Sequence, residues 1–196
     1  MYKYIFKRWL DFIIALLAMP FFIPVLIIVS PLIWLDDPGP IFYNAPRLGY
    51  KGKVFKMYKF RSMKVNAPDI RNEDGTTYNS ENDPRVTRVG RILRKTSIDE
   101  LPQLLNVLKG DMSLIGPRPD LPGAEKEVYR PGDKKKLTVK PGITGYSQAY
   151  YRNSSTIEQR FNGDVYYAKN VSIILDIKIM IKTIESVLAS KNIYRN

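Results

Sequence analysis

The sequence predicts a membrane-anchored α/β protein of mainly helical character. Residues 12–35 contain no charged side chain, and as a straight helix they would span about 36 Å, enough to cross the roughly 30 Å hydrocarbon core of a bilayer. Apolar residues recur at helical spacing in residues 86–95 and 101–108, and the isoleucine-rich residues 173–188 favour a third helix. Residues 54–60 alternate enough to favour a strand, with a short helix as the alternative.

The composition narrows the chemistry that the chain can perform. Its 196 residues suffice for one compact domain with an appendage. Because the chain contains no cysteine and no histidine, disulfides, thiol nucleophiles, serine–histidine triads and histidine metal ligands are excluded. Acid–base or metal work therefore falls chiefly to Asp and Glu. The formal net charge of +12 indicates an anionic partner: nucleic acid, a phosphorylated substrate or lipid headgroups.

The apolar run, residues 12–35, carries three prolines and is flanked by basic residues on both sides. Each proline removes a helical N–H and disfavours a straight helix, while the positive-inside rule places both flanks in the cytoplasm. Two arrangements stay open from the residues alone: a proline-kinked span, and a helix that breaks at Pro24 and returns to the same face. A cleaved signal peptide fits less well, because the run is long and lacks a small-residue cleavage site.

An adjacent carboxylate pair, Asp99 and Glu100, stands ahead of the helix expected at residues 101–108. Ser97 and Glu100 fit a capping box, although Pro102 would suit a helix that begins one or two residues later. A helix N-terminus favours ionised carboxylates, and neighbouring helical residues point in different directions. We therefore expect the pair to address two different partners, such as a phosphorus atom and a metal or proton. The alternative is that the pair only caps the helix.

Four basic residues are candidate phosphate ligands: Lys59, Arg61, Arg94 and Arg118. Arginine offers a bidentate fork and lysine a mobile point charge. Arg94 ends the helix expected at residues 86–95, just ahead of the acidic pair, and the two prolines beside Arg118 stiffen its turn. A solvated basic face is the alternative for Lys59 and Arg61. The other arginines of the 86–95 helix suit contact with anionic headgroups or with solvent.

Four motifs occur in order along the chain: KFRSM at residues 59–63, SIDELPQLLNVLKGDMSLIGPRP at 97–119, PGITG at 141–145 and DVYYAKN at 164–170. Together they resemble the bacterial sugar transferase family of monotopic phosphoglycosyl transferases, the PglC/WbaP-like enzymes. The resemblance runs from the N-terminal apolar segment to about residue 182, which is nearly the whole chain.

This resemblance implies a reaction. A sugar 1-phosphate passes from a UDP-sugar to a polyprenyl phosphate, expected to be undecaprenyl phosphate, and UMP is released, as the first membrane step of bacterial glycoconjugate synthesis. Asp99 and Glu100 would form the catalytic dyad, with Asp99 as the nucleophile of a covalent aspartyl phosphosugar intermediate. Magnesium is the expected cofactor, because oxygen ligands are the main ones that this chain offers. Its expected ligands are Asp99, Glu100 and Asp164.

The resemblance also implies a division of the chain. Residues 1–38 would form a re-entrant membrane helix broken at Pro24, and residues 39–196 a catalytic domain on the cytoplasmic face of the bacterial inner membrane, with interfacial amphipathic helices. Membrane lipids and both substrates are the expected partners, nucleic acid is not, and a homodimer stays open. Two departures matter: Ile23 stands where members often carry serine, and Tyr151 stands where they often carry glycine. The sugar is therefore not predicted.

Composition and charge fit a second class equally well: a non-catalytic, membrane-tethered basic binding protein. A nucleotidyl or lipid phosphatase is a further enzyme class to consider. Release of UMP from UDP-sugars separates the three, because a phosphatase would release inorganic phosphate or diphosphate and a binding protein would release neither.

Overall fold

A computed structural model describes residues 2–70, 78, 80, 82–124, 129–151 and 156–188. The α-helices are α1 (Lys7–Asp36), α2 (Arg88–Thr96), α3 (Gln103–Lys109), α5 (Tyr146–Tyr151), α6 (Ile157–Lys169) and α7 (Ile173–Leu188). The strands are β1 (Phe42–Leu48), β2 (Val54–Phe60), β3 (Ser113–Ile115) and β4 (Gly142–Thr144). Shorter helical turns cover Tyr2–Phe6, Tyr50–Gly52, Ile98–Glu100 and Asp133–Thr138. Helix predominates over strand, which confirms the mainly helical α/β prediction.

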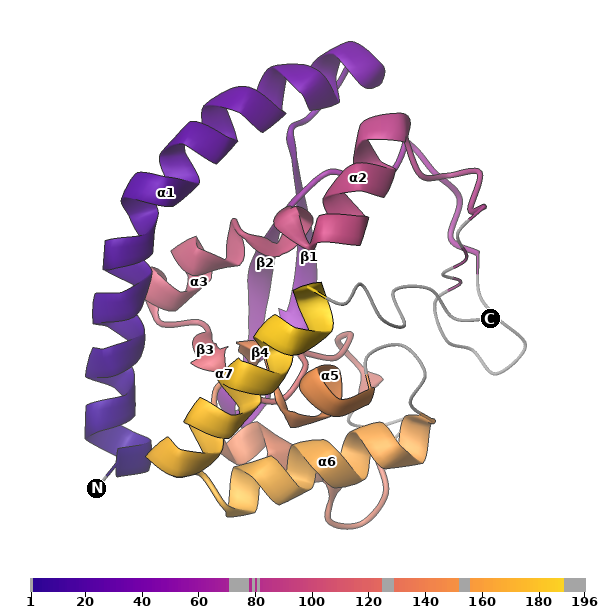
Figure 1. The fold of residues 1–196 in the computed structure, drawn as a ribbon. Helices are drawn as coiled ribbons and strands as arrows, with labels where there is room; N and C mark the ends of the chain where they lie inside the picture. Colours follow the sequence, from indigo (N-terminus) through magenta and orange to yellow (C-terminus); the bar gives the residue numbers. More distant parts are fainter. Residues whose placement is uncertain are drawn as a thin grey trace.

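Helix α1 curves around one side of the molecule and meets the rest of the chain at both of its ends (Figure 1). Its inner face buries Ala15, Phe22 and Val29, each seven residues from the next, in one core with residues of α2, α3 and β2. The outer face is apolar and exposed, with Phe21 78% accessible. Within the part of the chain that the structure describes, α1 is the one helix long and apolar enough to cross a membrane.

The break expected at Pro24 is not present, because α1 continues through Pro20, Pro24 and Pro31. Figure 1 shows a smooth arc where the sequence predicts two helices. Each proline removes one backbone hydrogen bond, and three spaced along the helix spread the bend over its length. Near the last proline, the Ser30 hydroxyl donates to the Leu26 carbonyl at 2.6 Å, a local bond that also bends helices.

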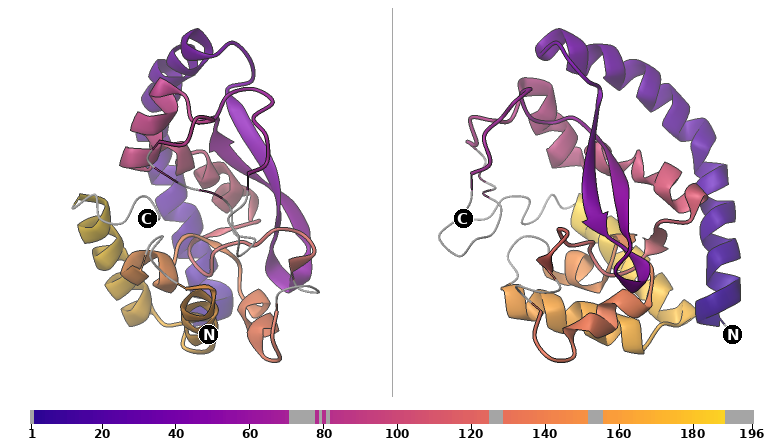
Figure 2. Two further views of the ribbon diagram at one scale, coloured as in Figure 1. Left: turned by 90° about the vertical axis from the view of Figure 1, so that its right-hand side faces the viewer. Right: turned by 180° about the vertical axis from the view of Figure 1, so that it is seen from behind.

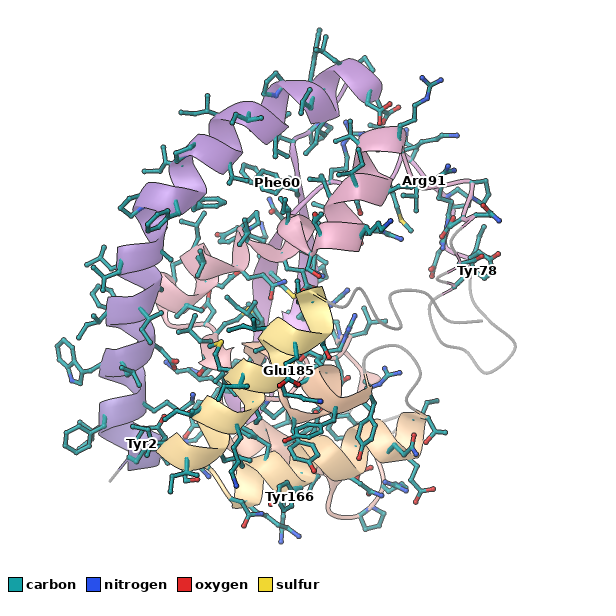
Figure 3. All side chains as sticks on the ribbon, viewed as in Figure 1. Tyr2, Phe60, Tyr78, Arg91, Tyr166 and Glu185 are labelled. Atoms are coloured by element: carbon teal, nitrogen blue, oxygen red, sulfur yellow. The ribbon has the colours of Figure 1, made fainter. Side chains whose placement is uncertain are left out.

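The first turns of α1 are fixed to the C-terminal helices by buried polar contacts. The Lys7 ammonium donates to Asp176 of α7 at 2.8 Å, and the hydroxyls of Tyr2 and Tyr167 donate to the same carboxylate at 2.6 and 2.7 Å. Figure 3 shows Tyr2 where α1 and α7 meet. Four residues further along, Asp11 accepts a hydrogen bond of 2.6 Å from the hydroxyl of Ser113 in β3. The charged groups at this end are therefore satisfied within the protein.

The other end of α1 is held by a different part of the same molecule. The Asp36 carboxylate accepts from the backbone N–H of Val89 at 2.8 Å, in the first turn of α2. Asp37, just beyond the helix, forms an ion pair with Arg61 and accepts from the N–H of Val65 at 2.9 Å. Both ends of the apolar helix are thus anchored to segments that pack around one core.

Strands β1 and β2 form an antiparallel hairpin that pairs Phe42 with Phe60 at one end and Leu48 with Val54 at the other. Figure 2 shows this hairpin on the face of the molecule opposite α7. Phe60 is buried between α1 and α2 (Figure 3) and stacks on Phe42 with ring centroids 5.6 Å apart. The strand expected at residues 54–60 is confirmed, and it carries Lys59 beside this core.

The parallel pair β3 and β4 joins the GPRP turn to the PGITG motif. A side chain on Gly142 would lie 2.1 Å from the nitrogen of Gly116, and one on Gly145 would lie 2.0 Å from the Gly116 carbonyl oxygen. Both distances are far shorter than any non-bonded carbon contact, so the two backbones pack this closely only because all three residues are glycine. This packing gives the glycines of PGITG a structural role.

Candidate active site

The carboxylate pair lies in the short 3₁₀ turn Ile98–Glu100, which links α2 to α3. Ser97 adopts φ of 60° and ends α2 in the left-handed conformation, and its side chain forms no capping hydrogen bond. The capping box expected from the sequence is therefore wrong. Helix α3 begins only after Pro102, the later start that a proline in the first turn favours. The pair thus occupies a tight corner between two helices.

The environment of Asp99 is unfavourable for a charged carboxylate. Burial is the largest effect on Asp99 and raises its pKa, the positive charges of Lys59 and Arg94 lower it, the negative charge of Glu100 raises it, and together these effects bring the pKa to about 6. The sequence predicts ionised carboxylates favoured by a helix N-terminus; here desolvation outweighs that effect for Asp99. A carboxylate whose pKa is raised by burial is a stronger base than one in water, and its loss of solvation also makes it a stronger nucleophile.

Glu100 forms an ion pair with a lysine of β2. Its Oε1 accepts a hydrogen bond of 2.6 Å from the ammonium of Lys59, the residue that β2 brings to the pair. Lys59 also acts electrostatically on Asp99, so it is shared by the pair, and separate partners for the two carboxylates stay a prediction. The KFRSM strand and the acidic turn, about forty residues apart in the sequence, form one cluster through this contact.

Arg94 is positioned by a close approach between α2 and the residues that follow β2. Its Nε donates to the Ser62 hydroxyl at 2.9 Å. One turn earlier, a side chain on Gly90 would lie 2.0 Å from the Ser62 carbonyl oxygen, so only glycine lets the helix pack there. Because Arg94 also acts electrostatically on Asp99, this packing places a guanidinium beside the pair, as the sequence predicts.

Asn106 connects the helix after the pair to the strand that carries Lys59. It is fully buried; its Oδ1 accepts from the N–H of Tyr58 at 2.9 Å, and its Nδ2 donates to the carbonyl of Lys56 at 2.8 Å. The side chain thus pairs with β2 as a neighbouring strand would. Sequence reasoning missed this residue, although a polar side chain between Leu105 and Val107 of a short apolar helix was the signal that could have found it.

Arg8 of α1 makes a second connection that the sequence did not predict. Its guanidinium donates to the carbonyl oxygens of Val107 and Leu108, in the last turn of α3, where backbone acceptors lack helical partners. A cation at a helix C-terminus also interacts favourably with the helix dipole. The apolar helix therefore supports the element that follows the acidic pair.

Two of the four predicted phosphate ligands do not contact the pair. Arg61 is buried, and its guanidinium donates to the carboxylate and carbonyl of Asp37 and to the carbonyl of Pro40 at 2.6 Å. It therefore fastens the end of α1. Arg118 is exposed on the GPRP turn, and among the described residues no ion pair or hydrogen bond joins it to Asp99 or Glu100.

Asp164, the third predicted metal ligand, belongs to a different cluster. It is 1% exposed, lies 2.7 Å from the ammonium of Lys136 and accepts from the Ser147 hydroxyl at 3.0 Å. The carboxylate of Asp120 lies 2.8 Å from the same ammonium and also forms an ion pair with it. Within the described residues no group of three or more acidic side chains is placed to share a metal. The three-carboxylate set expected from the sequence is therefore not assembled, because a buried carboxylate needs its own cation.

The sequence matches the model of the bacterial sugar transferase family over residues 2–190. The chain belongs to that family. It is 40% identical over 189 residues to the UDP-N-acetylgalactosamine-undecaprenyl-phosphate N-acetylgalactosaminephosphotransferase of Aeromonas hydrophila, covering 93% of this chain and 43% of that protein. It is also 40% identical over 196 residues to the UDP-glucose:undecaprenyl-phosphate glucose-1-phosphate transferase of Escherichia coli strain K12, covering 96% and 41%. The chain thus spans less than half the length of these two relatives.

A shorter relative matches along most of its length. The exopolysaccharide production protein ExoY of Sinorhizobium fredii is 40% identical over 199 residues, covering 96% of this chain and 88% of that protein. The family predicted from the four motifs is confirmed. The two named transferases are equally similar to this chain, at 40% identity, but their names give different sugars. Overall similarity therefore does not indicate which sugar this chain would take.

Proposed function

We propose that the chain transfers a sugar 1-phosphate from a UDP-sugar to a polyprenyl phosphate, with undecaprenyl phosphate as the acceptor and UMP as the second product. The observation that carries this proposal is the pair Asp99 and Glu100, packed with Lys59 and Arg94 in a member of the bacterial sugar transferase family. Two polyanions must approach each other in such a transfer, and nearby cations lower their repulsion.

In the proposed mechanism the two carboxylates have separate roles. Asp99 attacks the phosphorus that bears the sugar, the bond from that phosphorus to the oxygen of UMP breaks, and an aspartyl phosphosugar remains on the protein. A phosphate oxygen of the polyprenyl acceptor then attacks the same phosphorus, and the bond to Asp99 breaks. Lys59 holds Glu100 beside this centre, and Arg94 supplies positive charge near the phosphates.

Magnesium suits the donor set at this corner. It is commonly held by one or two carboxylates together with substrate phosphate oxygens, and Asp99 and Glu100 lie next to each other at this corner. Bound there, the ion would neutralise phosphate charge. We propose the pair, without Asp164, as its protein ligands, and full turnover in excess chelator would contradict a magnesium requirement.

The contacts of α1 support a re-entrant topology with both termini in the cytoplasm, at the inner membrane. Polar contacts hold both helix ends to the same domain, and the exposed tryptophans Trp9 and Trp34 lie near the two ends, where interfacial aromatic residues are favoured. Single cysteines replacing Lys3 and Lys53 should both resist an impermeant thiol reagent added outside sealed cells. Labelling at one site would show a spanning helix.

The direct test of the reaction is UMP release from a panel of UDP-sugars with undecaprenyl phosphate in detergent micelles. We expect at least one donor to release UMP, and Asp99→Asn to abolish the release. Inorganic phosphate as the product would identify a phosphatase. Donor binding without turnover by any sugar would favour the non-catalytic binding protein, the second candidate that the basic composition allows.

A further inference from the structure

An open cleft of about 670 Å³ lies where the end of α1 meets the start of α2. Leu35, Asp36 and Asp37 line one side, and Lys64, Arg88 and Arg91 contribute basic groups. A volume of this size is typical of small-molecule sites. None of the catalytic groups discussed above lines it.

The cleft carries positive charge that the described part of the chain does not neutralise. Its two acids are already engaged: Asp36 accepts from the N–H of Val89 at 2.8 Å, and Asp37 is paired with Arg61. Arg88 and Arg91 are exposed, and no described residue forms an ion pair or hydrogen bond with either guanidinium. Two adjacent arginine forks are suited to phosphate oxygens.

The position of the cleft indicates which phosphate it would hold. It opens at the end of the uncharged part of α1, where Leu35 is 70% exposed, and Ile92 of α2 is 63% exposed one turn from Arg88. An apolar surface that ends in a basic cleft is expected at the level where acyl chains give way to headgroups. In Figure 1 the end of α1 and helix α2 lie next to each other at the top of the molecule.

The cleft is separate from the reacting phosphates. Arg88 begins α2, whereas Asp99 follows the other end of that helix. The nine residues of α2 place these ends about 12 Å apart along the axis. A phosphate bound between Arg88 and Arg91 therefore does not reach the carboxylate that would attack the donor.

We propose that this cleft binds the headgroup phosphate of an anionic bilayer phospholipid and so fixes the N-terminal end of α2 at the membrane surface. The proposal rests on the membrane attachment proposed above and not on the transferase reaction. The occupant is a structural lipid, distinct from the polyprenyl phosphate that reacts.

The test is lipid retention by the full chain, purified in neutral detergent and mixed with phosphatidylglycerol and phosphatidylcholine, with bound lipids counted by native mass spectrometry. Wild type should retain phosphatidylglycerol in preference to phosphatidylcholine. The double variant Arg88→Gln with Arg91→Gln should weaken that retention about tenfold or more, since each basic group near an anionic surface adds its own contribution to the binding. The matched control is Lys95→Gln with Lys135→Gln, which removes two exposed charges outside the cleft and should bind as wild type.

Four results would overturn the proposal. Equal retention by all three proteins would show that the cleft holds no headgroup. Competition by glycerol phosphate as strong as that of the lipid would identify a soluble ligand. Weakened UDP-sugar binding in the arginine variant would assign the cleft to the donor. Flotation with phosphatidylcholine vesicles tests attachment by α1 separately, and failure of wild type to float would refute the lipid occupant, whereas loss of transfer activity alone would not.

Discussion

Replacing Asn106 by leucine should destabilise the protein without changing its outer surface. The side chain is fully buried and makes two hydrogen bonds, of 2.9 and 2.8 Å, with the backbone of Tyr58 and Lys56. Asn106→Leu keeps a similar volume and leaves that N–H and that carbonyl without partners. A buried polar group left unpaired costs about 1–3 kcal/mol, so two should lower the free energy of unfolding by about 2–6 kcal/mol.

Thermal unfolding in detergent, followed by circular dichroism, measures this effect. For a chain of this length, 1 kcal/mol shifts the melting temperature by about 2–4 °C, so the expected decrease is about 4–24 °C. Lys109→Ala is the matched control on the same helix, because Lys109 is exposed and surface changes stay within about 0.5 kcal/mol. If Asn106→Leu has the same melting temperature as Lys109→Ala, then Asn106 does not hold α3 to β2 as described.

Three further predictions concern the residues around the pair. Gly90→Ala should lower both the melting temperature and turnover, because its Cβ would lie 2.0 Å from the Ser62 carbonyl oxygen; a fully active, equally stable variant would contradict this packing. Because the pKa of Asp99 is raised to about 6 in the folded protein, the stability that its proton contributes is lost as the pH rises from about 4 to about 6. In chelator, Asp99→Asn should therefore be more stable than wild type by about 1–3 kcal/mol near pH 8, but equal to it near pH 4; equality near pH 8 would refute this burial. Lys59→Met should shift the acidic limb of the kcat/KM profile to higher pH, because a cation that lowers the pKa of Asp99 is lost, and Lys59→Arg should restore it; an unshifted limb would place Lys59 too far away.

Local periodicity predicted helices α2, α3 and α7 and the strand β2 well, whereas helices α5 and α6 were not predicted. Residues 86–95, 101–108 and 173–188 became α2, α3 and α7 with shifts of at most two residues at their ends, because each repeats apolar residues over two or more turns. Strands β3 and β4 were not predicted, since three residues are too few for a pattern. Strand β1 was missed as well: it contains Pro46, and its register depends on its hairpin partner.

The site was likewise predicted in part. The sequence indicated Asp99 and Glu100 as the dyad and Lys59 and Arg94 as phosphate ligands, and the structure brings these four into one cluster. Arg61 does not join this cluster. It pairs with Asp37 at the end of α1, 24 residues away in the sequence. The same holds for Asp164, whose cation is 28 residues distant. Charge alone does not reveal which partner a buried residue finds, since that choice is made by tertiary packing.

The bend of α1 shows a further limit of sequence reasoning. Three prolines in an apolar run indicate a departure from a straight helix, but not whether the chain breaks at one proline or curves over all three. Contacts far from the run decide this, because Lys7 and Asp36 at its two ends bind α7 and α2. The curvature that joins these anchors is a property of the whole fold.

The central claim is that Asp99 forms a covalent phosphosugar intermediate. Its most direct test is the intact mass of the protein after a productive UDP-sugar and magnesium are added without acceptor. We predict an increase equal to one sugar phosphate, mapped to Asp99 by peptide sequencing, absent from Asp99→Asn and lost from wild type when undecaprenyl phosphate is added. No adduct on the active wild type, together with initial rates that require a ternary complex of donor and acceptor, would contradict the covalent mechanism even if both carboxylates proved essential.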